Sequence, residues 1–72
     1  MIPLNFANVG HKVIIKRVGG LEETRRFLSN LGFIEGGEIT VISENSGNLI
    51  VGVKDSRVAI SKEMATKIIV SE

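Results

Sequence analysis

The 72-residue chain has few or none of several residue types that stabilise small proteins or form their functional sites. It contains no cysteine, tryptophan or tyrosine, one proline and one histidine. Without cysteine, disulfide bonds and thiolate metal sites are excluded. A chain of this size buries only about 60% of the surface that its unfolded form exposes, so apolar packing alone must stabilise it. We expect one domain spanning residues 1–72.

Charge of one sign and long apolar runs are also missing. Nine basic and eight acidic residues are spread along the chain, which gives a net charge of +1. No block of like charge marks a surface for a polyanion. No apolar run approaches the roughly 20 residues that span a bilayer, and the first residues lack the features of a signal peptide. We therefore expect a cytoplasmic protein that is not inserted in a membrane.

What the chain has in abundance is β-branched residues. Isoleucine and valine number eighteen, against five leucines, and this ratio favours strands. Alternating or continuous apolar segments predict strands at 11–18, 37–43, 49–54, 57–60 and 67–71. Residues 1–9 are expected to form an extended lead-in that covers one end of the core. Gly52, inside a predicted strand, indicates a bulge or a tight corner.

One amphipathic helix is predicted between the first two strands, from residue 21 to about residue 31. Leu21, Thr24, Phe27, Leu28 and Leu31 have the spacing of one helical face. Gly32 follows the last periodic leucine, where a left-handed residue commonly ends a helix. Near the end of the chain, Ser61 is a suitable N-cap for a single helical turn over residues 62–66.

These elements predict a mainly β fold: a small five-stranded barrel with an inserted amphipathic helix and a short C-terminal helical turn. Closing the barrel would remove the sheet edges that so small a protein cannot otherwise cover. Phe6, Phe27 and Phe33 all stand where a core would take them. Gly36 and Gly37 predict a turn that leaves Ile34 either buried or exposed. The expected core comprises Val13, Ile15, Leu28, Leu31, Ile39, Val41, Val51, Val53, Val58, Ile60, Ile68 and Val70.

The sequence offers no set of residues for catalysis or for a tight metal site. His11, the one histidine, follows Gly10 at a strand start and is expected to be a surface residue. The acidic residues are scattered one or two to an element, and neither glycine pair has the spacing or the lysine of a phosphate-binding loop. We predict no catalytic residues, no enzyme activity and no tightly bound cofactor or metal.

Small barrels also bind RNA or single strands, generally through aromatic stacking platforms and a basic groove. The platforms are missing here. Basic residues of the first strand and the helix could cluster if those elements are adjacent, although a solvated surface is the favoured interpretation. They are Lys12, Lys16, Arg17, Arg25 and Arg26. We expect no nucleic-acid binding, which leaves a protein-interaction module.

The string RRFLSNLGFIEGGEITV resembles the signature of the FeoA family. In that signature a basic helix runs into Leu-Gly, an apolar residue and a further glycine, and an alternating strand follows. The segments PLNFANVGHKVIIKRV and LIVGVKDSRVAISKEMATKIIV are similar to the start and end of the family. The family often carries a proline near ENSGN, where this chain has Asn48 instead.

The resemblance implies an SH3-like barrel that assists bacterial ferrous iron uptake by binding and modulating the cytosolic part of the membrane GTPase FeoB. We expect a monomer, and with one histidine and no cysteine we expect it to associate with Fe²⁺ weakly at most. Arg25, Arg26, Asn30 and Ile34 are the partner-binding residues expected from the resemblance. The alternatives are an SH3-like metal-ion-binding regulatory domain related to iron-dependent repressors, which the length of the chain disfavours, and a small-barrel nucleic-acid-binding module.

Overall fold

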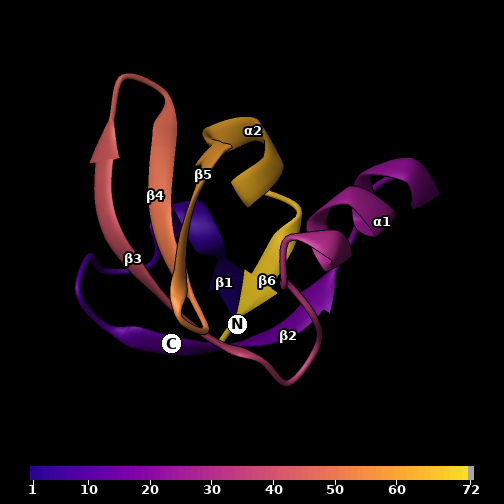
Figure 1. Ribbon diagram of the computed structural model, residues 1–72, viewed down its shortest axis with the longest axis horizontal. Helices are drawn as coiled ribbons and strands as arrows, with labels where there is room; N and C mark the ends of the chain where they lie inside the picture. Colours follow the sequence, from indigo (N-terminus) through magenta and orange to yellow (C-terminus); the bar gives the residue numbers. More distant parts are fainter. Residues whose placement is uncertain (72) are drawn as a thin grey trace.

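The computed structural model describes residues 1–71, which form a curved sheet with helical segments at its ends (Figure 1). The elements, in chain order, are β1 (Ile2–Pro3), the 3-10 turn η1 (Leu4–Phe6), β2 (Lys12–Val18), α1 (Glu22–Asn30), β3 (Glu38–Asn45), β4 (Asn48–Val53), β5 (Ser56–Ser61), α2 (Lys62–Ala65) and β6 (Ile68–Val70). The mainly β fold with an inserted helix and a C-terminal helical turn is confirmed.

The strands form one antiparallel sheet in the order β1-β6-β2-β3-β4-β5. The long strand β2 pairs with β3 through its first half and with β6 through its second half. All five predicted strands are present, and the lead-in supplies a sixth. Ile2 and Pro3 pair with Val70 and Ile69 of β6, which the sequence did not predict.

The sheet is not closed by strand pairing, and in this respect the prediction of a closed sheet is wrong. Within residues 1–71, β5 pairs only with β4, and β1 pairs only with β6. The two helical turns lie between these ends: η1 and α2 contact each other, η1 contacts β6, and α2 contacts β4 and β5. The predicted cap of α2 is confirmed, since the Met64 N–H donates to Ser61 Oγ at 3.1 Å.

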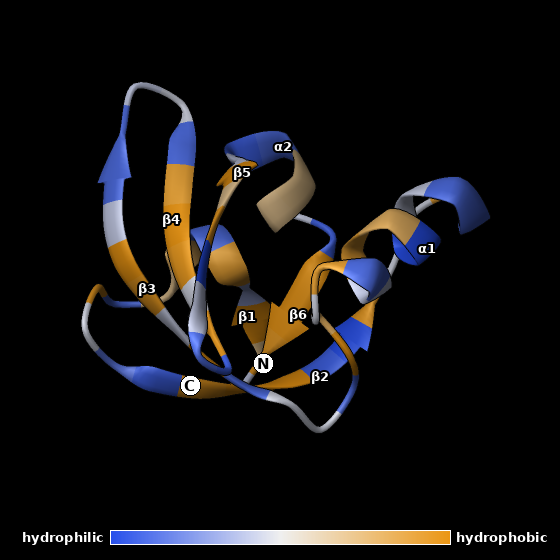
Figure 2. Ribbon diagram, viewed as in Figure 1, coloured by the Kyte–Doolittle hydropathy of each residue, from blue (hydrophilic) through white to orange (hydrophobic). Residues whose placement is uncertain are grey.

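The core lies inside the curve of the sheet, and the strands that surround it carry hydrophobic residues along much of their length (Figure 2). It consists of Leu4, Val13, Ile15, Leu28, Phe33, Ile39, Val41, Leu49, Val51, Val53, Ile60, Ala65, Ile68 and Val70. The predicted core is confirmed apart from Leu31 and Val58, which are only half-buried and pack against it. Val58 belongs to β5, an end strand, so no further strand covers its outer side. Leu4, Leu49 and Ala65 were not predicted.

Two of the three phenylalanines lie outside the core. Phe33 is buried, as expected, but Phe6 is 69% and Phe27 48% exposed. Leu21 is exposed as well, and Leu28 is the one fully buried residue of α1. The exposure of Leu21 and Phe27 follows from the position of the helix: α1 extends away from the barrel and is attached at its C-terminal end (Figure 1). The predicted apolar face of the helix is therefore only partly covered by the barrel.

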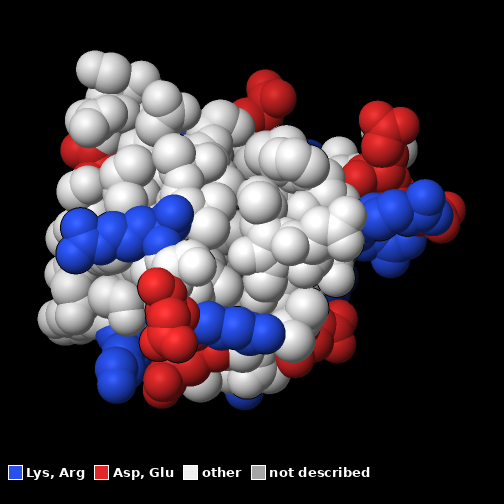
Figure 3. All heavy atoms as spheres, viewed as in Figure 1, with Lys and Arg blue, Asp and Glu red and all other residues white. Residues whose placement is uncertain are grey.

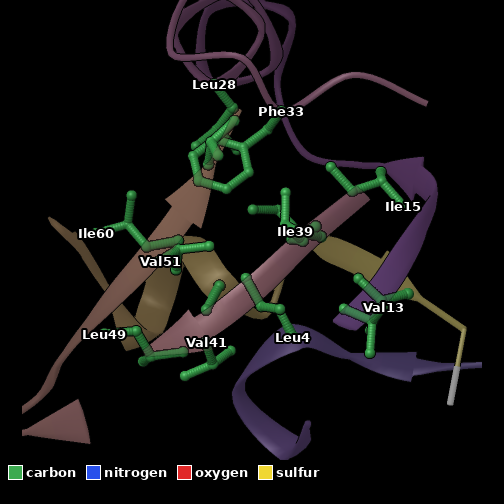
Figure 4. Packing of buried hydrophobic residues seen from close by; sticks show 14 residues of the cluster. Leu4, Val13, Ile15, Leu28, Phe33, Ile39, Val41, Leu49, Val51 and Ile60 are labelled. Atoms are coloured by element: carbon green, nitrogen blue, oxygen red, sulfur yellow. The ribbon is translucent and has the colours of Figure 1, made fainter. Parts of the chain in front are cut away.

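The end of α1 is a Schellman motif centred on Gly32. The Gly32 N–H donates to the Ser29 carbonyl at 2.9 Å, and the Phe33 N–H donates to the Leu28 carbonyl at 3.0 Å. The motif requires a left-handed residue at its turn, and Gly32 has φ +106°. Leu28 and Phe33, whose backbones are joined by the second of these hydrogen bonds, lie side by side in the core (Figure 4). Gly32 therefore ends the helix, as predicted.

The bulge expected near Gly52 is present, but the extra residue lies in the neighbouring strand. The β3–β4 register shifts between Val41 and Ser43, so that Ile42 has no direct partner. A Cβ on Gly52 would lie 3.3 Å from Ile42 Cδ1, which is closer than ordinary contact. The absence of a side chain at Gly52 therefore makes room for the bulged residue.

Replacing Gly32 by alanine is expected to destabilise the protein more than replacing Gly36. Both residues have positive φ, so each variant carries the backbone cost of about 1–2 kcal/mol. At Gly32 the new Cβ would also lie 2.7 Å from Val53 Cγ1, whereas at Gly36 it would have no neighbour within 4 Å. Denaturant unfolding of Gly32→Ala and Gly36→Ala measures the difference. Equal unfolding midpoints for the two variants would contradict the close approach of Gly32 to Val53 of β4.

Truncating Val41 or Val51 to alanine is expected to lower the free energy of unfolding by about 1–3 kcal/mol through lost burial and a residual cavity. The two side chains are 2% and 0% exposed and face each other across β3 and β4. Val9→Ala, at an exposed position, is the control and should change the midpoint little. Unchanged midpoints for the two core variants would show that the strand register is wrong.

Candidate docking surface

The outer face of α1 carries three of the four residues predicted to bind a partner. Arg25, Arg26 and Asn30 are all exposed, and Arg26 and Asn30 share one face because they are four residues apart. Arg26 Nη2 donates to Glu22 Oε2 at 3.0 Å, one turn earlier in the helix. Arg25 has no carboxylate within ion-pair distance among residues 1–71.

Ile34, the fourth predicted residue, lies in the loop beyond the helix end and is 44% exposed. The Schellman motif explains its position. Phe33 turns into the core to meet Leu28, and the next side chain is left outside. The Ile34 carbonyl accepts a hydrogen bond from the Gly37 N–H at 3.0 Å, which fixes the loop around it. Ile34 is thus presented on an ordered turn rather than on a free segment.

A second feature of α1 was not predicted: a shallow groove between its apolar side and α2. We call it the α1–α2 groove, and it is lined by Glu23, Thr24, Phe27 and Met64. A second hollow shares Thr24 and Met64 with it and is lined also by Glu63 and Lys67. Phe27 is the aromatic residue of the groove lining and is 48% exposed. The sequence signal was the strong apolar periodicity of the helix, which was assigned wholly to the core.

Charges of both signs are mixed over the surface of the protein. Figure 3 shows basic and acidic side chains interspersed around an uncharged centre, with both signs present on α1. Three exposed ion pairs are formed among the described residues, Lys12–Glu38, Arg26–Glu22 and Lys62–Glu44. Of the basic residues of β2 and α1, Lys12 and Arg26 are paired with carboxylates, whereas Lys16, Arg17 and Arg25 have no ion-pair partner among residues 1–71. Glu22 and Glu38 thus place negative charge beside the basic side chains, unlike the basic groove that tracks a nucleic-acid backbone.

In the described part of the chain, donor atoms for a metal ion do not come together. Within residues 1–71 no three histidine, aspartate or glutamate residues lie close enough to hold one. His11 is exposed beside a small hollow whose other lining residues are Ile2, Phe6, Ala7, Asn8 and Val13. None of these supplies a carboxylate, so the hollow does not provide the ligand set of a structural or catalytic metal site. The residues that the structure describes therefore do not fit a tightly bound metal.

None of the helices in the described part of the chain is long and apolar enough to cross a membrane. The longest of them, α1, has nine residues and carries four charged side chains in its first half.

Comparison with known proteins gives a consistent result over the whole chain. The FeoA domain family model matches residues 2–72. The chain is 33% identical over 72 residues to a protein of Methanocaldococcus jannaschii named as an Fe(2+) transport protein A, and the match covers 100% of this chain and 88% of that protein.

Solved structures agree with the fold. The crystal structure of an iron uptake regulatory protein (FeoA) superimposes with a TM-score of 0.88 at 31% identity, covering 97% of this chain and 93% of that one. Stenotrophomonas maltophilia FeoA, a prokaryotic SH3-domain protein crystallised with zinc, gives a TM-score of 0.88 at 22% identity, covering 99% and 91% of the two chains. The predicted SH3-like fold is confirmed.

Anaerobic titration with Fe²⁺ or Zn²⁺ is expected to reveal no stoichiometric site tighter than about the micromolar range, because the ligand set is missing. Isothermal calorimetry measures this directly. His11→Asn is the matched variant, and it should remove any weak surface association at the histidine while leaving folding unchanged. A tight site that this substitution abolishes would contradict the prediction and favour a metal-sensing role.

Proposed function

Because the chain belongs to the FeoA family, we propose that it is an accessory protein of ferrous iron uptake that binds the cytosolic part of an FeoB-like membrane GTPase and modulates it. The observation that carries this proposal is the family match along residues 2–72, together with a relative at 33% identity that is named for Fe(2+) transport. On this proposal the protein works by binding in the cytoplasm, as a monomer, and not as an enzyme.

The geometry of α1 supports docking as the mode of action. The helix is fixed to the barrel at its C-terminal end, and the rest of it extends into solvent. A partner can therefore reach Arg25, Arg26 and Asn30 without any rearrangement of the core. Ile34, on its ordered turn, adds an apolar contact beside the helix end. An exposed apolar residue next to charged ones matches the mixed character of transient protein interfaces.

Charges on the rim of an interface mainly set the rate and orientation of association. Arg25 is suited to this role because no carboxylate neutralises it among residues 1–71. Arg26 is paired with Glu22, but both side chains are largely exposed, so the pair contributes little to stability and can exchange partners on binding. We assign the two arginines to recognition of acidic groups on the GTPase.

Reversing both charges tests this assignment. Arg25→Glu with Arg26→Glu is expected to leave folding nearly intact, since exposed ion pairs contribute about 0–1 kcal/mol and a like-charge pair with Glu22 costs a few tenths more. The same variant should lose most of its binding to the purified cytosolic part of the GTPase in a pull-down. It should also restore ferrous uptake poorly in a strain that lacks its own FeoA protein.

The matched control is Lys16→Glu with Arg17→Glu, which changes the net charge equally at two exposed positions of β2. It should bind and complement like the wild type. Equal losses in both double variants would show that binding depends on net charge rather than on α1. Salt-sensitive binding of wild-type protein to RNA or DNA in a gel shift, with no binding to the GTPase, would overturn the proposal in favour of the nucleic-acid alternative.

A further inference from the structure

The strand β5 is an open edge of the sheet. It pairs with β4 over six consecutive residues and with no other strand among residues 1–71. Its outward-facing side chains are accessible, since Arg57 and Ala59 are both exposed. α2 follows directly at Lys62 and contacts β5. On the inner side of the strand, Val58 is half-buried and Ile60 is buried.

The register of the β4–β5 hairpin identifies which backbone groups are free. The hairpin closes at Val53 and Ser56 across a two-residue turn, and the closing pair of such a turn is hydrogen-bonded. Hydrogen-bonded and non-hydrogen-bonded pairs alternate along an antiparallel ladder. The N–H and C=O groups of Arg57 and Ala59 therefore point away from β4, towards the open side.

The two ends of the sheet differ in how they are protected. Natural edge strands are usually short, or carry proline, lysine or a bulge that prevents another strand from pairing. β1 has two of these features, because it is two residues long and ends at Pro3. β5 has six residues, no proline, no lysine and no register shift. Arg57 is its one charged residue.

We propose that the open edge of β5 binds an extended acidic segment of a partner protein, which adds to the sheet as a further antiparallel strand. Backbone groups of Arg57 and Ala59 would pair with those of the segment, as in other cases of strand addition. An apolar side chain of the segment would cover the half-buried Val58, and a carboxylate would lie near Arg57, which has no ion-pair partner in residues 1–71.

The charge of the edge favours this occupant over a second copy of the chain. A second copy paired through β5 would bring its own Arg57 to the same side of the extended sheet, and like charges there are destabilising. An acidic segment supplies the opposite charge. The proposal does not depend on the docking of the GTPase at α1, because β5 contributes none of Arg25, Arg26, Asn30 and Ile34.

The test uses the full chain, labelled for NMR, and a short synthetic peptide of alternating valine and threonine with one central glutamate. At a peptide concentration about ten times the Kd, the amide protons of Arg57 and Ala59 should exchange with solvent about tenfold more slowly. The Val58 amide, which is bonded to β4, should change far less and is the internal control. Replacing the peptide glutamate by lysine should weaken binding.

Two variants test the edge itself. Ala59→Pro removes an N–H that the β4 ladder does not use, so the fold should persist while peptide binding is lost. Ala59→Val, which keeps the N–H, is its matched control and should bind normally. Arg57→Glu should reverse the preference, so that the lysine peptide binds better than the glutamate peptide.

If Ala59→Pro fails to fold, a peptide with methylated backbone nitrogens provides the same test. Methylation removes the peptide N–H groups that would donate to the free carbonyls of Arg57 and Ala59. Loss of binding on methylation is the expected result. Binding that survives methylation, shifts that map to the α1–α2 groove, or no binding of the glutamate peptide would each overturn the proposal. Self-association through β5 in the absence of peptide would show instead that a second copy is the occupant.

Discussion

Leu28 and Phe33 pack against each other where α1 meets the barrel, and the position of the helix depends on this contact. Both residues are buried, and the hydrogen bond between their backbones spans the turn at Gly32. No other residue of α1 is fully buried. The helix is therefore fixed at one end by a hydrogen-bonded motif and a pair of apolar side chains, and the same turn that buries Phe33 leaves Ile34 at the surface. The turn at Gly32 thus determines both that Phe33 is buried and that Ile34 is exposed.

The short strands of so small a protein explain why the sheet remains open. With short strands and a chain of 72 residues, the ends β1 and β5 do not meet, and two single helical turns occupy the space between them. η1 places Leu4 and α2 places Ala65 in the core, so the interior is sealed by side chains rather than by a closed ladder of hydrogen bonds. Sealing the interior in this way buries the apolar side chains but leaves one edge of β5 without a strand partner among residues 1–71.

Much of this architecture could be predicted from the sequence, because strand alternation and turn residues are local signals. The strands, the glycine that ends α1 and the serine that caps α2 all follow from such signals. Phe6, Phe27 and Val58 were misjudged because periodicity shows which residues share a face, but not whether another element covers that face. The two-residue strand β1 and the α1–α2 groove depend on contacts between distant segments, for which the sequence carries no local pattern.

Attachment of α1 at one end has a consequence for how a partner can be recognised. Residues on opposite sides of a helix are normally divided between core and solvent, but here both sides of α1 are accessible near its N-terminal end: Arg25 and Arg26 on one, Thr24 and Phe27 on the other. A protein that bound around the helix could contact the charged side chains on one side and the Phe27 ring on the other. Such binding would bury the apolar surface of α1 that the barrel leaves exposed, and burial of apolar area is the dominant favourable term in association. If a partner docks at α1 as proposed, the incomplete packing of the helix would supply part of the contact surface.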